Sequence, residues 1–182
     1  MHVRLASTRE DLQDILALQR ENLRDHVSPE DARSEGFVTV AHTLEALEQM
    51  HALAPSVIAR EGEVLAGYAL TMPLEARDAA PVLAPMFALF DALVWQGRPL
   101  SQSRYYVMGQ VCVARAFRGQ GVLDALYRGH KEAYAQRFDF MVTEIATRNT
   151  RSMRAHARVG FQVLTTYRDA LDEWAVVLWD WR

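Results

Sequence analysis

The stretch Val111–Leu123, which reads VCVARAFRGQGVL, decides the fold expected for this chain. Alternating apolar residues at its start are typical of a strand, and a basic connector leads from them to Gly119 and Gly121. The apolar residues that follow recur with a helical period: Val122, Leu123, Leu126, Tyr127, Ala133 and Tyr134. Because such glycines let the backbone turn its N–H groups toward one point, and a helix N-terminus carries a partial positive charge, the pattern favours a bound phosphate. An ordinary strand-to-helix turn is the alternative that the glycines alone leave open.

Arg118 precedes the first of these glycines and adds a side-chain cation for the same anion. The loop lacks the Lys-Ser/Thr ending of a nucleotide-binding P-loop and the third glycine of a dinucleotide fingerprint. A nucleotide-phosphate site is therefore the weaker interpretation.

The loop resembles the pyrophosphate loop of the GNAT superfamily of N-acetyltransferases, whose pattern is Arg/Gln-x-x-Gly-x-Gly/Ala. The matching residues are Arg118, Gly119, Gln120, Gly121, Val122 and Leu123. A second landmark of that family is a helix with the pattern N-x-x-(A/S)-x-x-x-Y-x-(K/R)-x-G-F. Its counterparts here are Asn149, Ser152, His156, Arg158, Gly160 and Phe161. The resemblance is close from about Tyr105 to the C-terminus and extends to the N-terminal half only in pattern.

The resemblance implies that acetyl-CoA is bound as a co-substrate. The residues implied to contact it are Val111, Cys112, Val113, Arg118, Gly119, Gln120, Gly121, Val122, Leu123, Asn149 and Ser152. In the family, the strand before the glycine loop pairs with the pantetheine amides, and one of its backbone N–H groups faces the thioester oxygen as in an oxyanion hole. Two residues depart from the family pattern: Leu123 stands where Gly or Ala is preferred, and Arg115 where proline is frequent.

His156 and Glu144 are the candidate catalytic residues. His156 occupies the position where the family often has the tyrosine that protonates the leaving thiolate, and an imidazole with an ordinary pKa of about 6.5 can donate a proton near neutral pH. Two other roles stay open for His156, a bond to the sulfur without proton transfer and no catalytic part. Glu144, a carboxylate in an otherwise apolar strand, is the candidate base. The structural alternative is that Arg148 or Arg151 simply neutralises it.

Other chemistries find little support in the sequence. Cys112 has no Cys/His/Asp spacing around it, so a core thiol is expected rather than an acetyl-enzyme. No metal is expected, because the histidines lack metal-ligand spacing. They are His2, His26, His42, His51, His130 and His156.

The composition is ordinary for a globular protein: half of the 182 residues are hydrophobic, 24% are charged, and the net charge is −3. We expect one domain over residues 1–182. The charge gives no basic footprint for nucleic acid, and no apolar run approaches the roughly 20 residues of a membrane span. A cytoplasmic location is expected, because the single cysteine cannot form an internal disulfide and the start MHVRLASTRE has no signal-peptide pattern.

The expected strands cover residues 2–6, 56–60, 63–71, 104–113, 138–146, 162–167 and 174–181. Their alternation with helical segments predicts an α/β fold with helices on both faces of the sheet. The resemblance further implies a mixed, mostly antiparallel sheet of about seven strands, as in GNAT proteins.

Helix starts are expected at three places in the N-terminal half. Ser7 with Glu10 forms the pattern of a capping box, Ser28 before a proline opens a short piece that ends near Gly36, and Thr43 can cap a further helix. In the resembling family these early helices border the acceptor site, so Phe37 and its surroundings are candidates for substrate contact. A plain packing pair of helices is the alternative.

The stretch Ala76–Trp95 reads as an insertion, since the family usually joins the third and fourth strands by a short turn. Its second half is a helix that is apolar over most of its circumference, and Gly97 is expected to end that helix as a C-cap. A lid on the acceptor pocket, a subunit contact and an extension of the core are all open for it.

The sequence therefore predicts an acetyl-CoA-dependent N-acetyltransferase that acts on a primary amine by direct attack in a ternary complex. The acceptor is expected to be a small molecule or a peptide, without nucleic acid or membrane as a partner, and a homodimer is left open. A non-catalytic acyl-CoA-binding or regulatory module on the same fold is the alternative, because the family's tyrosine is missing.

Overall fold

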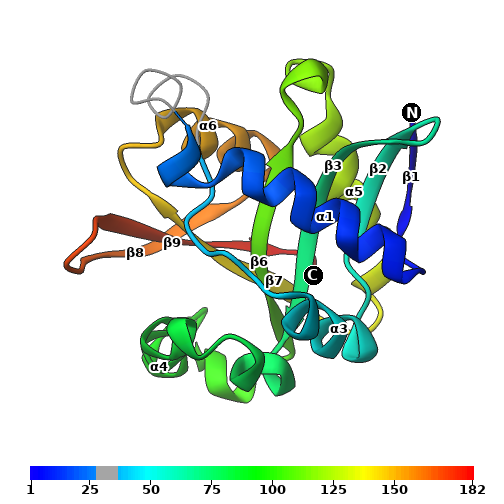
Figure 1. Ribbon diagram of the computed structural model, residues 1–182. Coiled ribbons are helices and arrows are strands. Elements are labelled where there is room, and N and C mark those ends of the chain that lie inside the picture. The colour runs from blue at the N-terminus through cyan, green and yellow to red at the C-terminus, as the bar shows by residue number, and fades with distance from the viewer. Residues whose placement is uncertain (28–36) are drawn as a thin grey trace.

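The computed structural model describes residues 1–27 and 37–182 of the chain. At its centre is a seven-stranded sheet in the order β1-β2-β3-β6-β7-β9-β8 (Figure 1). Neighbouring strands are antiparallel except β6 and β7, which are parallel. The strands are β1 (His2–Leu5), β2 (Val57–Glu61), β3 (Val64–Pro73), β6 (Tyr105–Val113), β7 (Phe140–Ala146), β8 (Gln162–Arg168) and β9 (Glu173–Asp180). The mixed, mostly antiparallel sheet is thus confirmed.

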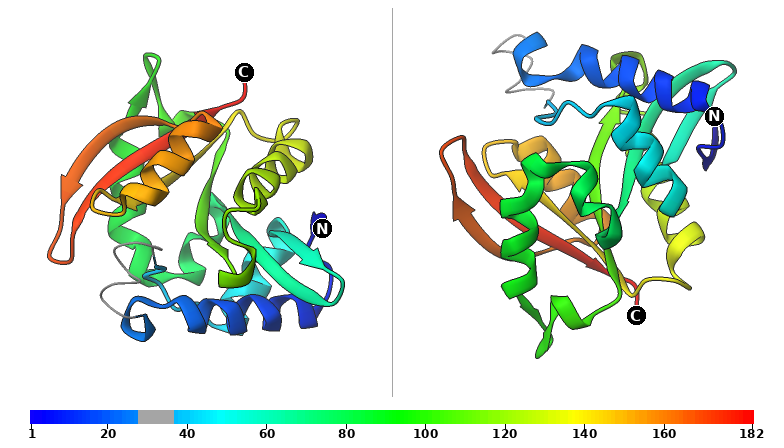
Figure 2. Two further views of the ribbon diagram at one scale, coloured as in Figure 1. Left: turned by 90° about the horizontal axis from the view of Figure 1, so that it is seen from above. Right: turned by 60° about the horizontal axis from the view of Figure 1, so that its bottom comes forward.

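Helices cover both faces of this sheet, as predicted (Figure 2). On one face lie α1 (Arg9–Asn22), α3 (Leu44–Leu53) and α4 (Ala84–Ala92), and on the other lie α5 (Val122–Tyr134) and α6 (Thr150–Val159). Short 3-10 turns connect them: η1 (Arg24–His26), η2 (Leu74–Ala79), η3 (Pro81–Leu83), η4 (Leu100–Gln102) and η5 (Arg115–Phe117). Among the described residues, none of the helices has the length and apolar character needed to span a bilayer.

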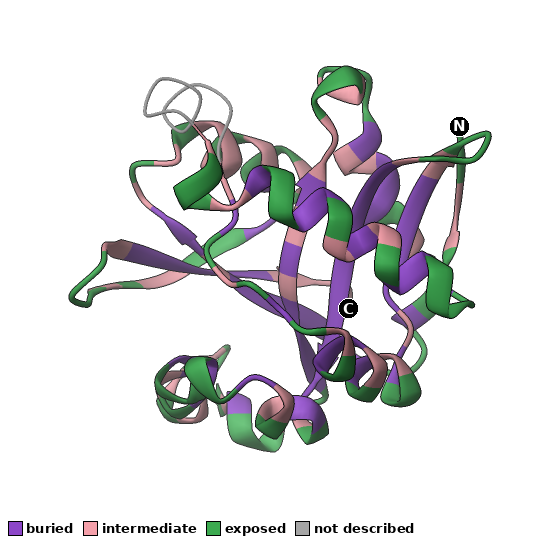
Figure 3. Cartoon of the chain, viewed as in Figure 1, coloured by how far each residue is buried: buried purple, intermediate pink, exposed green. Residues whose placement is uncertain are grey.

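The two faces of the sheet carry separate apolar cores because side chains alternate along each strand. On β6, Tyr105 and Val107 pack under α1, α3 and α4, whereas Tyr106 and Met108 pack under α5 and α6. Figure 3 shows the result, with buried strands between helices whose outer sides are exposed. Each fully buried large apolar side chain contributes roughly 1.5–3 kcal/mol, so the sheet is held from both sides.

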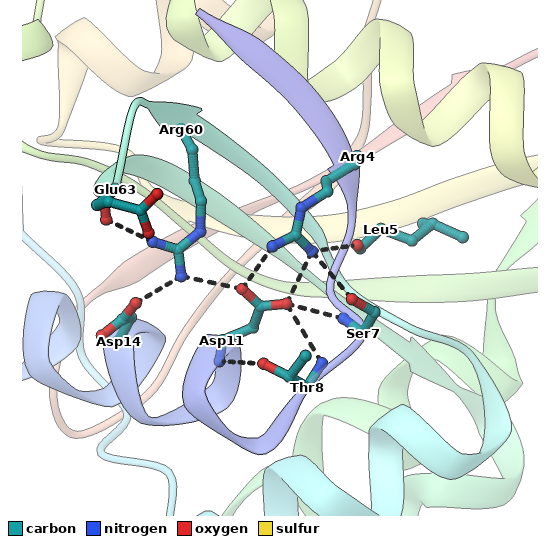
Figure 4. Close-up of polar contacts among 8 residues, drawn as sticks. All are labelled: Arg4, Leu5, Ser7, Thr8, Asp11, Asp14, Arg60 and Glu63. Atoms are coloured by element: carbon teal, nitrogen blue, oxygen red, sulfur yellow. Dashed lines mark hydrogen bonds and ion pairs between the residues drawn. The ribbon is translucent and has the colours of Figure 1, made fainter.

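The start of α1 differs in detail from the prediction. The N-cap is Thr8 and its capping-box partner is Asp11, one residue later than the predicted pair of Ser7 and Glu10. The reason lies in tertiary contacts that sequence spacing does not show. The buried Asp11 carboxylate accepts hydrogen bonds from Arg4 of β1 at 2.7 and 2.8 Å and from Arg60 of β2 at 2.9 Å (Figure 4). Burial by itself would raise the pKa of Asp11, but these bonds and one from the Ser7 N–H lower it overall.

Other local predictions meet different outcomes. Thr43 caps α3 by accepting the Ala46 N–H, as expected. The helix predicted from Ser28 to Gly36 lies outside the described residues.

The helix of the insertion is shorter than predicted. α4 ends at Ala92, and the small hairpin formed by β4 (Val94–Trp95) and β5 (Arg98–Pro99) follows it. Gly97, with φ of 79°, lies in the turn of this hairpin and is not a helix C-cap. The buried side chains of α4 belong to the core cluster shared with α1 and α3. They are Met86, Phe87 and Phe90. Of the three roles left open, the contacts of this segment within the chain are those of a core extension.

Candidate functional site

A cleft opens where the two parallel strands separate. β6 and β7 pair over residues 105–107 and 140–142, and just beyond this the Thr143 hydroxyl donates to the Met108 carbonyl at 2.8 Å. From there β6 continues beside β3 to Val113, whereas β7 continues beside β9 (Figure 1). The edge of β6 that faces the gap therefore presents backbone N–H and C=O groups to whatever enters it.

A bulge in β6 sits at the point of separation. Ala69 of β3 is opposite Val111 and Thr71 is opposite Met108, so residues 109 and 110 face a single residue of β3. The side chain of Gln110 turns into the interior, where it donates to the Val40 carbonyl at 2.8 Å. Its carbonyl accepts hydrogen bonds from Gln19 of α1 and Tyr68 of β3. This network is not among the features predicted from the sequence, although a glutamine inside an apolar strand is a signal for it.

The glycine loop has the backbone geometry that its sequence predicts. Gly119 and Gly121 have φ of 77° and 78°, a left-handed conformation that side chains rarely adopt. Gly121 is the N-cap of α5, and no side chain of the described residues caps that helix. A Cβ placed on either glycine would meet nothing within 4 Å. The N-terminus of α5 is therefore open to an anion, and glycine keeps its approach free.

A cleft of about 680 Å³ lies between this loop, β6 and α6. This volume is within the range of small-molecule sites, about 300–1,000 Å³. The predicted cofactor residues that line it are Val111, Cys112, Val113, Arg118, Gly119, Gly121, Val122, Leu123, Asn149 and Ser152. Gln120 is the exception, because its side chain donates to the Ala116 carbonyl on the loop itself. Lining residues that sequence reasoning did not single out include Asn22, Phe117, Asp124 and Arg154.

Arg118 holds the loop in place. Its Nε donates to the Val113 carbonyl at 3.1 Å, and its guanidinium donates to Asn22 at the end of α1 at 2.7 Å. The guanidinium thus adds positive charge to the cleft wall while joining β6, the loop and α1.

α6 forms the opposite wall with a basic face. Asn149 caps this helix by accepting the Ser152 N–H at 3.1 Å, so its side-chain carbonyl is engaged and its amide nitrogen is the group left to donate. Arg151, Arg154 and Arg158 follow at helical spacing and line the cleft. Arg158 pairs with Asp124 of α5 at 2.8 Å across the cleft.

A smaller cavity of about 90 Å³ adjoins the cleft on the side of β7. Phe37 and Val38 line both cavities, and Glu144, Gln110 and Trp174 line the smaller one alone. The guanidinium carbons of Arg24 and Arg148 lie 5.6 and 4.9 Å from the centre of the Phe37 ring. Phe37 thus lies at the site, and its contact with a substrate stays a prediction.

Glu144 is bound by a tyrosine. Burial raises the pKa of Glu144, while a hydrogen bond from the Tyr167 hydroxyl at 2.5 Å opposes the rise. Arg148, one of its suggested partners, pairs with Asp172 instead. A partly buried carboxylate with a raised pKa beside a cavity is suited to accept a proton.

His156 is buried in α6 beside the same cavity, with 2% of its surface exposed. Its Nδ1 is 2.8 Å from the Ser152 carbonyl and its Nε2 is 2.5 Å from the Tyr127 hydroxyl. Burial lowers the pKa of His156 to about 4, so the ring is neutral at neutral pH. The expectation of an imidazolium that titrates near neutrality does not fit this environment, and a proton from His156 would have to come from the neutral ring.

Cys112 is a buried thiol, in agreement with its interpretation as a core residue. Burial raises the pKa of Cys112 to about 12. The reactive form of a cysteine is the thiolate, which this environment disfavours. The described residues also hold no cluster of three or more metal-ligating side chains.

Comparisons with known proteins agree with this geometry. The model of the acetyltransferase (GNAT) family matches residues 12–161. A sequence comparison with curated proteins gives no match. Among solved structures, a ribosomal-protein-alanine N-acetyltransferase from Brucella melitensis is similar with a TM-score of 0.64 at 18% identity, covering 99% of both chains.

Two further structures have the same fold. An N-acetyltransferase from Staphylococcus aureus Mu50 gives a TM-score of 0.64 at 18% identity over 100% of this chain and 98% of that one. The yncA protein of Salmonella typhimurium, with its cofactor acetyl-CoA, gives 0.63 at 18% identity over 100% and 94%.

Proposed function

The chain belongs to the GNAT family of acetyltransferases, and we propose that it transfers the acetyl group of acetyl-CoA to a primary amine by direct attack in a ternary complex. The observation that carries this proposal is the junction of the open N-terminus of α5 with the free edge of β6 in one cleft. This junction fits two parts of CoA. The diphosphate is an anion suited to the helix N-terminus, and the amides of the pantetheine arm can pair along the strand.

The residues around the loop fit the diphosphate of CoA. Both Gly119 and Gly121 line the cleft, and a Cβ on either would meet no atom within 4 Å, so space is free there for a phosphate at the helix N-terminus. Arg154 on the facing helix supplies positive charge to the same cleft, whereas the charge of Arg158 is paired with Asp124. When bound, acetyl-CoA supplies the thioester. The exposed backbone of residues 111–113 would hold the pantetheine arm and direct an N–H at the thioester oxygen.

The acceptor amine would enter through the smaller cavity and meet Glu144. An amine must be neutral to attack, and most primary amines are protonated at neutral pH. A carboxylate whose pKa is raised by burial accepts that proton more readily than an exposed one. The cleft and the cavity share part of their lining, so donor and acceptor can be bound together. The protonated thiol of Cys112 favours such direct transfer over an acetyl-enzyme.

The acceptor class that we propose is a small-molecule or peptide amine, and the expected location is the cytoplasm. The test is turnover of acetyl-CoA with a panel of primary amines, following release of the CoA thiol together with the mass of the acetylated product. Acetylated amine is the expected result. Tight CoA binding in calorimetry without turnover of any amine would instead favour the non-catalytic CoA-binding module, which the absence of the family's tyrosine keeps in view.

A further inference from the structure

The reacting atoms must lie where the two cavities meet, because the thioester comes from one and the amine from the other. This inference rests on the proposed acetyl transfer. Residues that line both cavities are Phe37, Val38, Val111, Asn149 and Ser152. Three of these have apolar side chains, and the Asn149 carbonyl already caps α6. Of the described residues in this shared wall, Ser152 is the one that carries a hydroxyl.

The proton of the neutral His156 ring is directed at the helix backbone. The Ser152 carbonyl can only accept, so at 2.8 Å from Nδ1 it requires the hydrogen on Nδ1. Nε2 then carries a lone pair, which accepts the Tyr127 hydroxyl at 2.5 Å. Both ring nitrogens are thereby engaged, and the ring has no further hydrogen to offer to the cleft.

Nδ1 also lies 3.3 Å from the Ser152 hydroxyl oxygen, so its one hydrogen is shared between the Ser152 carbonyl and this hydroxyl. A hydroxyl oxygen that accepts from the ring keeps its own hydrogen for a different acceptor. In the cleft proposed to hold acetyl-CoA, the electron-rich atom that needs such a hydrogen is the sulfur that departs from the acetyl group.

We propose that the Ser152 hydroxyl donates the hydrogen bond that stabilises the departing sulfur, and that His156, fixed by Tyr127, is a positioning residue for this hydroxyl. In the step, the amine nitrogen bonds to the thioester carbon, the C–S bond breaks and its electron pair goes to the sulfur. Glu144 has by then released the ammonium proton to solvent, so the proton that nitrogen loses on attack passes to the ionised Glu144 and from there to solvent. The thiolate is stabilised by Ser152 until it takes a proton from water. A thiol with a pKa of about 8.5 leaves readily enough for a hydrogen bond to suffice.

A matched pair of substitutions isolates the hydroxyl. Ser152→Thr keeps it and Ser152→Val has nearly the same shape without it. We expect the valine variant to have a kcat roughly 10- to 100-fold below that of the threonine variant, the effect of losing one hydrogen bond to a charged atom. The Kd of CoA, measured by calorimetry, should be the same for both. Equal kcat values in the two folded variants would overturn the proposal.

His156→Phe separates the positioning role from direct donation. If the ring acts through Ser152, the double variant with Ser152→Ala should be no slower than Ser152→Ala alone. A loss of kcat of roughly 100-fold in His156→Phe, with parental kcat in Ser152→Ala, would make the ring itself the donor and overturn the proposal. A parent enzyme that turns over no amine at all would defeat the proposed acetyl transfer, and this inference with it, before any variant is compared.

Discussion

The large cleft, the proposed donor end, and the smaller cavity, the proposed acceptor end, share five lining residues but are otherwise built from different parts of the polypeptide. At the donor end, the free edge of β6, two left-handed glycines and the N-terminus of α5 present mainly backbone groups. At the acceptor end, side chains from residues 37–39, the bulge of β6, β7 and Trp174 of β9 form the cavity. The donor end is dominated by the continuous stretch Val111–Leu123, to which α6 adds its basic face, whereas the acceptor end brings together side chains from segments that are far apart.

This difference has a chemical reason. A diphosphate and a chain of amides are recognised by N–H and C=O groups, which every residue carries, so shape and backbone conformation decide the donor end. Amine chemistry requires a proton acceptor and a shaped pocket, so side-chain identity decides the acceptor end. Substitutions at the donor end should therefore mainly change the Kd of CoA, whereas substitutions at the acceptor end should mainly change kcat or the KM of the amine.

The largest effect is expected from Gly121→Val. The valine would project from the N-cap of α5 into the cleft and displace a phosphate from the helix N-H groups. Loss of two or so charge-assisted hydrogen bonds should weaken CoA binding by roughly 1,000-fold, or about 4 kcal/mol. Calorimetry with CoA measures the change.

Gly97→Val is the matched control for this variant. Gly97 has φ of 79°, and a Cβ there also meets nothing within 4 Å, but it lies in the β4–β5 hairpin. Both variants should lose similar stability from the strained backbone. Comparable losses of CoA affinity in the two would show that strain, and not occupation of the cleft, is responsible.

The next largest effect is expected at the acceptor end, from Glu144→Gln. Removal of the base should lower kcat roughly 100-fold, the lower end for general acid–base catalysis, with little change in the Kd of CoA. Glu63→Gln, in the exposed β2–β3 turn, is the control and should behave like the parent.

The pH dependence of kcat/KM provides a second test of Glu144, and its direction follows from the pKa of this residue. In our proposal the ionised form of Glu144 is the base, and burial raises its pKa. The parental kcat/KM should therefore rise with pH through that raised pKa and level off above it. The profile should be measured with a weakly basic amine that is already neutral over this range. A Glu144→Gln enzyme that keeps the same rise would assign it to another group.

The same division explains how much could be predicted from the sequence. The donor end follows from Val111–Leu123, because local backbone geometry is encoded by neighbouring residues such as Gly119 and Gly121. The acceptor end depends on tertiary contacts. Neither the Tyr167 hydroxyl on Glu144 nor the contact of Gln110 with Val40 has a spacing rule that would reveal it.

Capping and the insertion show the same limit. The Thr8–Asp11 cap forms because the Asp11 carboxylate is bound by Arg4 and Arg60 from two strands, and the local sequence offered an equally good alternative one residue earlier. The helix of the insertion ends early because the chain turns into a hairpin at Gly97. The apolar circumference of that helix indicates that the helix is buried, but not which part of the chain packs against it.

A pair of aromatic substitutions, each with a moderate expected effect, tests whether the two ends are independent. Phe117 lines the donor cleft and Trp174 the smaller cavity, each without lining the other. Phe117→Ala should weaken CoA binding about fivefold, corresponding to about 1 kcal/mol of lost apolar contact, and leave the acceptor KM unchanged. Trp174→Phe should raise the acceptor KM by a similar factor and leave the Kd of CoA unchanged. If either variant changed both constants equally, the two ends would not be independent.

The smallest effect is expected from Cys112→Ala. Its side chain is the most reactive type on β6, yet burial raises the pKa of the thiol to about 12, and only 7% of the residue is exposed. The contribution of this strand to the donor end is its backbone, which alanine preserves. We therefore expect a kcat and a CoA Kd within about twofold of the parent, with a modest loss of stability of about 1 kcal/mol from the small cavity. Thermal unfolding and steady-state kinetics measure the two quantities separately. An acetylated Cys112 in the mass spectrum of the enzyme with acetyl-CoA, together with a large loss of kcat in the alanine variant, would contradict direct transfer. In that case a side chain, and not only the backbone, would decide the donor end as well.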